Sequence, residues 1–169
     1  VTRKRVVSSI LLSDLGSSME KIILSLEPHA WHGHATETVW AERVGTQQYR
    51  IRSVPFYAKD LGYGDVVITN RGTQGEVVER VTIRSGHSTY RLFLAEGASF
   101  ESEAFQRDWK PLEDLGCTME RATKRLIAID VPPNTSIHAA YRLMEKGERD
   151  GVWEFEEGYC APTAQGPAS

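Results

Sequence analysis

Alternating apolar and polar positions predict five short strands in the first half of the chain. After Met19, the residues Ile22, Leu24 and Leu26 lie on one side of a run whose other side is polar, which is the period of two of a half-buried strand. Four similar runs follow, each next to a turn residue such as Gly, Asn or Pro, at residues 37–44, 49–54, 64–70 and 76–85. Because no helical spacing interrupts them, this half predicts an SH3-like small β-barrel or a strongly bent sheet.

The second half changes to a mixed pattern of strands and helices. Residues 88–95 predict an apolar strand, and three bulky apolar residues at i, i+4 and i+7 then predict a helix over residues 102–115. Gly116 is placed to end that helix, whereas Pro111 is expected to kink it or to split it in two.

A hairpin, a second helix and a last strand complete this half. The hairpin covers residues 117–131, and Asn134 or Thr135 is expected to cap a helix that Gly147 ends before a final strand. The order strand, helix, strand, strand, helix, strand predicts a ferredoxin-like βαββαβ module, so the fold class is α+β. In such a module both helices cover one face of the sheet and the other face stays free.

These patterns divide the chain into four parts. Residues 1–18 form an N-terminal extension that we expect to be dispensable, because a linker-like S-D-L-G-S-S precedes Met19, a candidate natural start. Residues 19–85 form the β-rich, barrel-like module and residues 86–158 the ferredoxin-like module. The remaining residues, 159–169, are expected to be a disordered tail.

Composition excludes some classes of protein and of setting. The chain has 169 residues, 40% of them apolar, and a net charge of -3 with acids and bases interspersed, which argues against a nucleic-acid binder. The two cysteines have neither disulfide-framework nor zinc spacing, and no apolar run approaches the length that crosses a bilayer. We therefore expect a cytoplasmic protein without a membrane partner.

Seven short segments carry a resemblance to a known family. They are V-W-A-E-R-V, Y-R-I-R-S-V-P-F-Y-A, Y-G-D-V-V, S-G-H-S, L-G-C-T-M-E, D-V-P-P and G-V-W-E-F. In this order and spacing they resemble the uncharacterised bacterial family named domain of unknown function 4265. The resemblance covers about residues 19–159 and implies a fold type and a bacterial origin, with no activity or catalytic residue to carry over.

Three histidines form a candidate metal site. His29, His32 and His34 lie within six positions, and imidazoles in such a group can bind zinc or nickel. No Cys or acid completes the set nearby, and Pro28 and Gly33 mark a flexible connection between strands. The residues therefore favour a loop without a metal, and we expect no cofactor.

The turn that joins the two halves contains the candidate catalytic residues. His87 supplies an imidazole, Ser85 and Ser88 supply hydroxyls, and Arg84 and Arg91 can hold an anion. No G-x-S-x-G motif accompanies them. The favoured alternative is a hairpin turn whose histidine packs against the module interface.

Two other polar residues have structural explanations. Asp130 is expected to accept backbone hydrogen bonds in a strand-to-helix loop. Cys117 is expected to be a small buried thiol, because no histidine is near it in the sequence.

The loop over residues 56–64 is a candidate recognition surface. It combines Tyr57, Lys59, Asp60 and Tyr63 between two strands, and aromatic residues beside charges are typical of binding sites. Its first residue, a phenylalanine, is expected to close one end of the barrel. We expect this loop and the turn around His87 to line a cleft between the modules.

Three classes of function remain open. Small size, mixed charge, a free sheet face and the lack of a closed catalytic set favour a non-enzymatic binding protein, such as an immunity-type inhibitor or an accessory partner of another bacterial protein. The alternatives are a small tailoring enzyme or hydrolase that uses His87, and a small-ligand-sensing domain. We expect a monomer, or a homodimer that forms through the free sheet face.

Overall fold

The computed structural model describes residues 18–163. The predicted extension therefore lies outside the described residues except for Ser18, and the same holds for residues 164–169 of the predicted tail. Among the residues that are described, no helix has both the length and the apolar character needed to cross a membrane.

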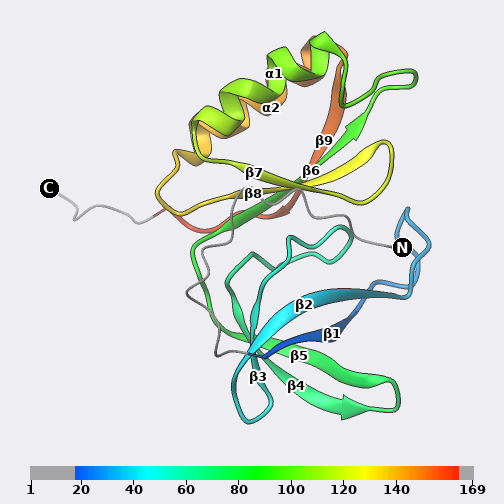
Figure 1. Cartoon of the computed structure of the whole chain (residues 1–169), viewed down its shortest axis with the longest axis vertical. Coiled ribbons are helices and arrows are strands. Elements are labelled where there is room, and N and C mark those ends of the chain that lie inside the picture. The colour runs from blue at the N-terminus through cyan, green and yellow to red at the C-terminus, as the bar shows by residue number, and fades with distance from the viewer. Residues whose placement is uncertain (1–17, 164–169) are drawn as a thin grey trace, which may run out of the picture.

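Five strands of the first half close into a barrel (Figure 1). Adjacent strands are antiparallel, except that a parallel contact of Ile23 with Val77 joins the first strand to the fifth. The side chains of Ile22, Val39 and Tyr49 are completely buried inside. The alternating apolar residues of the sequence thus fill the interior of the closed sheet, as their pattern predicted. The strands are β1 (Met19–Ser25), β2 (Thr36–Gly45), β3 (Gln48–Ile51), β4 (Val66–Gly72) and β5 (Gly75–Ile83).

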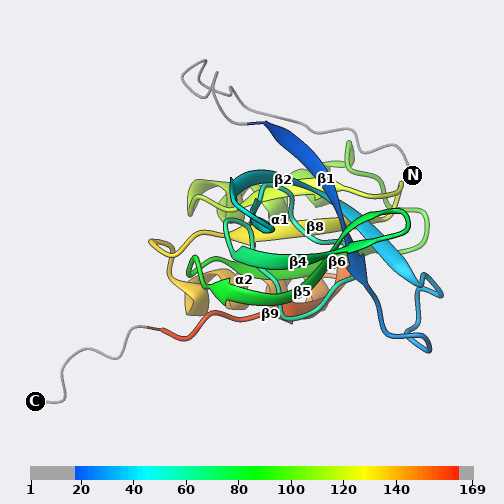
Figure 2. The ribbon, with the colours of Figure 1, turned by 90° about the horizontal axis from the view of Figure 1, so that it is seen from below.

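The second half is an antiparallel sheet of four strands covered by two helices. The sheet order is β7-β8-β6-β9, so the two most apolar strands are central. Both helices lie on the same face of the sheet, with the barrel on the opposite side (Figure 1). Figure 2 looks from the barrel side and shows the barrel strands in front of the sheet and helices. The elements are β6 (Ser88–Leu94), α1 (Glu103–Asp114), β7 (Thr118–Arg121), β8 (Leu126–Val131), α2 (Ile137–Arg149) and β9 (Trp153–Tyr159).

Both helices continue through residues that were expected to interrupt them. Pro111 lies in the last turn of α1 without splitting it, where the missing N–H removes only one late hydrogen bond. Gly147 lies inside α2 and does not end it. Glycine is required at this position, because a Cβ there would meet the Trp153 ring at 2.1 Å. The cap of α2 is Ser136, one residue beyond the predicted candidates, and its side chain accepts from the Ala139 N–H. Gly116 does follow α1 in a left-handed conformation, as predicted.

The second face of the sheet is not free, which corrects the expectation from the sequence. Leu126 and Ala128 on β8 are buried against Val54 and Phe56 of the segment that connects β3 to β4. The barrel module therefore covers this face with its own chain. Apolar side chains on a sheet face need such a cover, so a homodimer through that whole face is no longer expected.

The ordered chain also extends past the predicted end of the second module. Tyr159 belongs to β9, and Ala161 is buried with its N–H donated to the Ser88 hydroxyl at 2.9 Å. The first residues of the predicted tail are therefore part of the packed structure.

Candidate functional site

The segment between β3 and β4, residues 52–65, forms the contact between the modules and is called here the junction loop. Glu37 fixes its first half: this buried carboxylate accepts from the N–H groups of Phe56, Tyr57 and Ala58 at 2.6, 2.9 and 3.0 Å. Three backbone donors on one buried carboxylate hold the loop in a single path.

Asp65 fixes the other end of the junction loop. Its carboxylate is completely buried and accepts from the Gly62 N–H at 3.0 Å and from the Ser85 N–H at 2.8 Å. The Arg84 guanidinium pairs with it at 2.9 Å. Asp65 therefore joins the loop directly to the turn that leads into β6.

Side chains of β6 hold the middle of the junction loop against the sheet. The Thr89 hydroxyl donates to the Leu61 carbonyl at 2.9 Å, and the Arg91 guanidinium donates through Nη2 to the Ala58 carbonyl. The Asp60 N–H donates to the Gly158 carbonyl at 2.9 Å. The two segments that the sequence predicted to meet do lie together, but buried loop residues fill the space between them.

His87 lies at one end of this contact, next to Tyr63. Its Nδ1 is 2.8 and 3.0 Å from the two carboxylate oxygens of Asp130, and its ring centre is 5.4 Å from that of Tyr63. A Cβ on Gly62 would approach the His87 carbonyl oxygen to 2.6 Å, so the close contact of loop and turn requires glycine there. We call this group the His87 end of the junction.

Asp130 therefore has a different partner from the one expected. It pairs with the His87 imidazole, whereas the sequence suggested backbone donors. Burial raises the pKa of Asp130, and the neighbouring His87 partly opposes that rise. The expectation failed because the two residues are 43 positions apart and meet only through β6–β8 pairing.

The two candidate serines do not hydrogen-bond to the His87 ring within residues 18–163. The Ser85 hydroxyl donates to the Tyr63 carbonyl at 2.6 Å and accepts from the His87 backbone N–H at 3.2 Å. The Ser88 hydroxyl accepts from the Ala161 N–H at 2.9 Å. Both hydroxyls are thus engaged by backbone groups, which is the arrangement of a structural turn.

Lys59, Asp60 and Arg84 lie along a shallow groove of about 470 Å³ on the barrel side of the junction loop. Arg84 is already committed there, since it donates to the Asp60 carbonyl at 2.8 Å and lies over the Tyr159 ring at 4.2 Å. Its guanidinium therefore connects the junction loop to the last strand of the second module.

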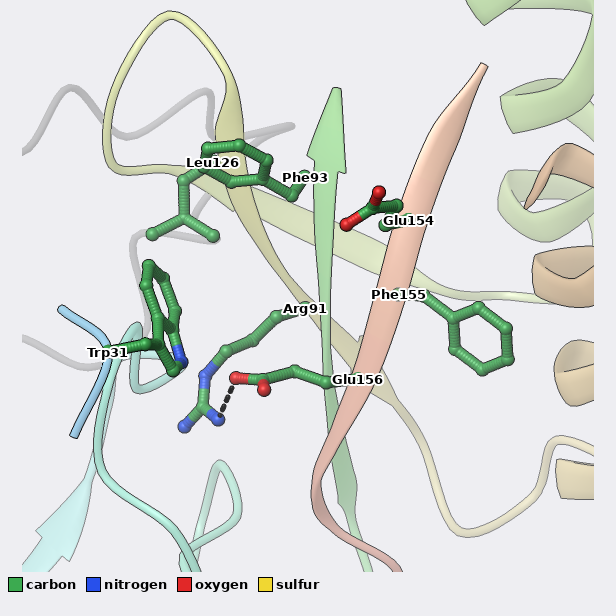
Figure 3. A pocket seen from close by; sticks show the side chains of 7 residues that line it. All are labelled: Trp31, Arg91, Phe93, Leu126, Glu154, Phe155 and Glu156. Atoms are coloured by element: carbon green, nitrogen blue, oxygen red, sulfur yellow. Dashed lines mark hydrogen bonds and ion pairs between the residues drawn. The ribbon is translucent and has the colours of Figure 1, made fainter. Parts of the chain in front are cut away.

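A second cavity of about 350 Å³ lies at the other end of the junction, on the sheet face that the loop leaves uncovered; we call it the hollow. Figure 3 shows Trp31 facing Arg91 across it, with Phe93 and Leu126 along one side, while the Phe155 ring points away. The residues that line the hollow are Trp31, Arg91, Phe93, Leu126, Glu154, Phe155 and Glu156.

Arg91 is the buried charge of the hollow. Its side chain is only 2% exposed, Nη1 donates to Glu156 at 2.9 Å and Nη2 donates to the Ala58 carbonyl. Its Nε–H is buried and finds no hydrogen-bond partner among the described residues. A buried guanidinium nitrogen without any hydrogen-bond partner is uncommon, because an unsatisfied buried donor costs free energy.

An aromatic cluster borders the hollow next to Trp31. The ring of Tyr57 is 4.8 Å from that of His32 and 4.5 Å from that of His34, and Trp31 lies 6.2 Å from Tyr57. The His32 Nδ1 accepts the His34 N–H at 3.0 Å. Burial, followed by the nearby charges of His34 and Arg91, lowers the pKa of His32.

The structure gives the candidate metal site no convergent ligand set. His32 and His34 stack at 5.7 Å, but within residues 18–163 no group of three or more His, Cys, Asp or Glu side chains is placed to hold an ion. Cys117 and Cys160 are both free thiols, and burial raises the pKa of Cys117 to about 12.

The predicted binding residues thus divide among three places, one of which is the groove on the barrel side of the junction loop. Tyr63 lies at the His87 end, whereas Tyr57 belongs to the aromatic cluster beside the hollow. Sequence reasoning marked Arg91 but missed most of the side chains around it. The usable signals were an arginine within an otherwise apolar strand and the alternation W-E-F-E in the last strand, which turns two glutamates to one face.

The comparisons with known proteins identify a family. A family model described as Domain of unknown function (DUF4265) matches residues 37–155. The chain belongs to the DUF4265 family. That span includes His87, Asp130 and Arg91 and leaves out Trp31. The name of the DUF4265 family carries no activity, so the chemistry must come from the site itself.

A solved structure supports the fold of this DUF4265 member. It is described as a novel crystal structure of a hypothetical protein from Neisseria gonorrhoeae, 13% identical, with a TM-score of 0.72. The similarity covers 86% of this chain and 97% of that chain, and at this identity it shows the fold alone. No curated protein matches the chain.

Proposed function

We propose that this protein is a non-enzymatic binding protein and that the hollow is its binding site. The observation that carries the proposal is Arg91, a buried guanidinium whose Nε–H has no partner within the described part of the chain, beside a cavity with aromatic walls. Junctions between modules are common places for binding sites, and the volume lies within the range of small-ligand pockets.

Energetics support a recognition role for this arrangement. An unsatisfied buried donor costs about 1–3 kcal/mol, which a bound acceptor would recover. The Arg91 guanidinium is also held from two sides, by Glu156 and by the Ala58 carbonyl, so a ligand would pay little to order it. The exposed Trp31 and the apolar side chains beside it supply area for contact.

The occupant is a small ligand or a side chain presented by another bacterial protein. An inhibitor of the immunity type or an accessory partner fits the second case, and a ligand-sensing domain the first. As parts of the same proposal, we assign the barrel to the SH3-like class and the four-stranded sheet with its helices to the ferredoxin-like class. The strand order β7-β8-β6-β9 supports the second assignment. The cytoplasmic location and the four-part division of the chain stay predictions.

A screen for thermal stabilisation tests the proposal. A library of several hundred small molecules of mixed charge is tested against the wild type and against Glu154→Trp, which places a bulky ring at the exposed rim of the hollow. Thr38→Trp, on an exposed position of β2 outside the hollow, is the matched control. Compounds should raise the melting temperature of the wild type and of the control, but not of Glu154→Trp. If no compound does so, or if the hits persist in Glu154→Trp, the hollow is not the binding site.

An acid–base enzyme is the second candidate function, and the His87–Asp130 pair favours it. Asp130 holds Nδ1, which leaves Nε2 of His87 available for proton transfer. If the protein binds a partner, Tyr57→Ala should weaken the complex by about 1–3 kcal/mol, and His87→Ala should matter less. If it is an enzyme, His87→Ala should lower turnover by a factor on the order of a hundred or more.

A further inference from the structure

The direction of each Arg91 N–H group indicates what the hollow can bind. Nη1 donates to Glu156 and Nη2 donates to the Ala58 carbonyl, whereas the buried Nε–H finds no partner among the described residues. In Figure 3 the guanidinium extends from β6 toward Trp31. A carboxylate is the strongest acceptor that could meet such a donor, because both partners are charged.

Trp31 adds a second donor on the same side. Figure 3 shows the indole nitrogen at the end of the ring that faces the Arg91 guanidinium, and an indole N–H can only donate. Trp31 is 60% exposed and lies on the connection between β1 and β2, so the ring can shift to admit an acceptor to the covered Nε–H.

The rest of the lining is apolar on one side and acidic on another. Phe93 and Leu126 form the apolar side (Figure 3), and Glu154 and Glu156 come from the neighbouring strand β9. One arginine against two glutamates leaves the lining with a net charge of -1. Arg125 lies outside the lining, over the Phe93 ring at 4.5 Å, where it donates to the Leu94 carbonyl.

A simple anion would meet this excess of negative charge, and a simple cation would meet the Arg91 guanidinium. A ligand with both charges satisfies both sides. We propose that the hollow binds a small zwitterion with an apolar body, in chemical terms an amino acid with an apolar side chain. Its carboxylate meets the Arg91 Nε–H, its ammonium group meets Glu154, and its side chain packs between Trp31, Phe93 and Leu126.

This inference rests on the proposed function and is tested by three matched probes. L-Phenylalanine carries both charges, 3-phenylpropionate lacks the ammonium group and phenethylamine lacks the carboxylate. Isothermal titration calorimetry at pH 7 should give L-phenylalanine a dissociation constant at least about tenfold lower than either of the others, since each charged hydrogen bond is worth about a factor of ten or more.

Variants at two exposed residues test the ammonium group and the carboxylate of the ligand separately. Glu154→Gln should reduce the advantage of L-phenylalanine over 3-phenylpropionate to about twofold or less, because the ammonium group loses its partner. Trp31→Phe keeps an aromatic ring without the N–H, so it should weaken both carboxylate probes about tenfold and leave phenethylamine unchanged. Arg91→Lys should remove the preference for carboxylates; if it does not fold by circular dichroism, the two exposed variants decide the question.

The outcomes distinguish the two proposals. Equal affinities for the three probes, or tightest binding of a probe with a single charge, overturn the zwitterion while the hollow stays a binding site. If no probe binds at millimolar concentration but the library yields compounds that Glu154→Trp abolishes, the ligand class is wrong and the proposed function stands. If the library also yields none, both fail.

Discussion

The two ends of the junction loop differ in how completely their polar groups are paired. At the His87 end, Asp130 pairs with the imidazole, Asp65 accepts from three donors and both serine hydroxyls are bonded to backbone groups. At the other end, the buried Arg91 keeps an N–H without a described partner beside an open cavity. The polar groups of the first end hold the two modules together, whereas the second end still has a donor that can bond to a ligand.

From this difference we expect the His87 end to contribute to stability and the Arg91 end to contribute to ligand recognition. A buried polar network in which every member is paired fixes one arrangement of the chain and has little left for a ligand. An incompletely paired group lowers stability, so its presence in a folded protein points to another use. Variants at the first end should therefore change stability, and variants at the second end should change binding.

The largest effect is expected from Asp65→Ala at the His87 end. The change removes the acceptor of the Gly62 and Ser85 N–H groups and the carboxylate partner of Arg84, which should cost about 3–5 kcal/mol and lower the melting temperature by about 10 °C. Asp60→Asn is the matched control, because Asp60 is exposed and asparagine also tolerates its positive φ of 58°. A melting temperature within a few degrees of wild type for Asp65→Ala would show that this end does not hold the two modules together.

A smaller effect is expected from Thr89→Val in the middle of the junction. Valine keeps the shape but leaves the Leu61 carbonyl without its donor, which should cost about 1–2 kcal/mol in the free energy of unfolding. Urea denaturation measures the change, and Thr38→Val on an exposed position of β2 controls for the loss of a hydroxyl. Equal midpoints for the two variants would mean that this hydrogen bond does not hold the modules together.

The smallest effect concerns pH, and the two ends should respond in opposite directions. The pKa of His32 is lowered in the folded state, so its contribution to stability is full above its ordinary value of 6.5 and is lost as pH falls through the lowered pKa. The pKa of Asp130 is raised, so its contribution is full below its ordinary value of 3.8 and is lost as pH rises through the raised pKa.

Melting temperatures between pH 4 and pH 8 test this pair of signs. His32→Gln should lose less stability than the wild type on acidification from pH 7, and Asp130→Asn should lose less on going up from pH 4. Parallel curves for the wild type and both variants would contradict the assignment of these two groups.

Local patterns in the sequence predicted the elements, while contacts between distant residues decided their ends. Alternation identified the strands of the barrel, because a sheet with one buried face imposes a period of two. Gly147 was expected to stop a helix, but the Trp153 ring needs the space that only glycine leaves. The proline in α1 did not break the helix, because it lies in the last turn, where its missing N–H removes only one hydrogen bond.

The candidate site was predicted in its segments and missed in its arrangement. The loop around Tyr57 and Tyr63 and the turn around His87 do meet, as the covalent connection of the modules suggested. The sequence could not show that Tyr57 and Tyr63 lie at different ends, because that depends on how the loop crosses β6. Trp31 comes to the hollow from a loop 60 residues before Arg91, a contact with no trace in local spacing.

We expect a ligand to bind at the open end of the junction and not at the paired end. The most direct measurement is a ¹⁵N NMR titration of the full chain with L-phenylalanine, following side-chain N–H and backbone amide signals together. We predict shifts at the Trp31 indole N–H, the Arg91 Nε–H and the amides of Phe93 and Leu126, with none at Tyr63 or His87. Shifts concentrated at Tyr63, His87 and Asp130, with the signals of Trp31 and Arg91 unchanged, would contradict it.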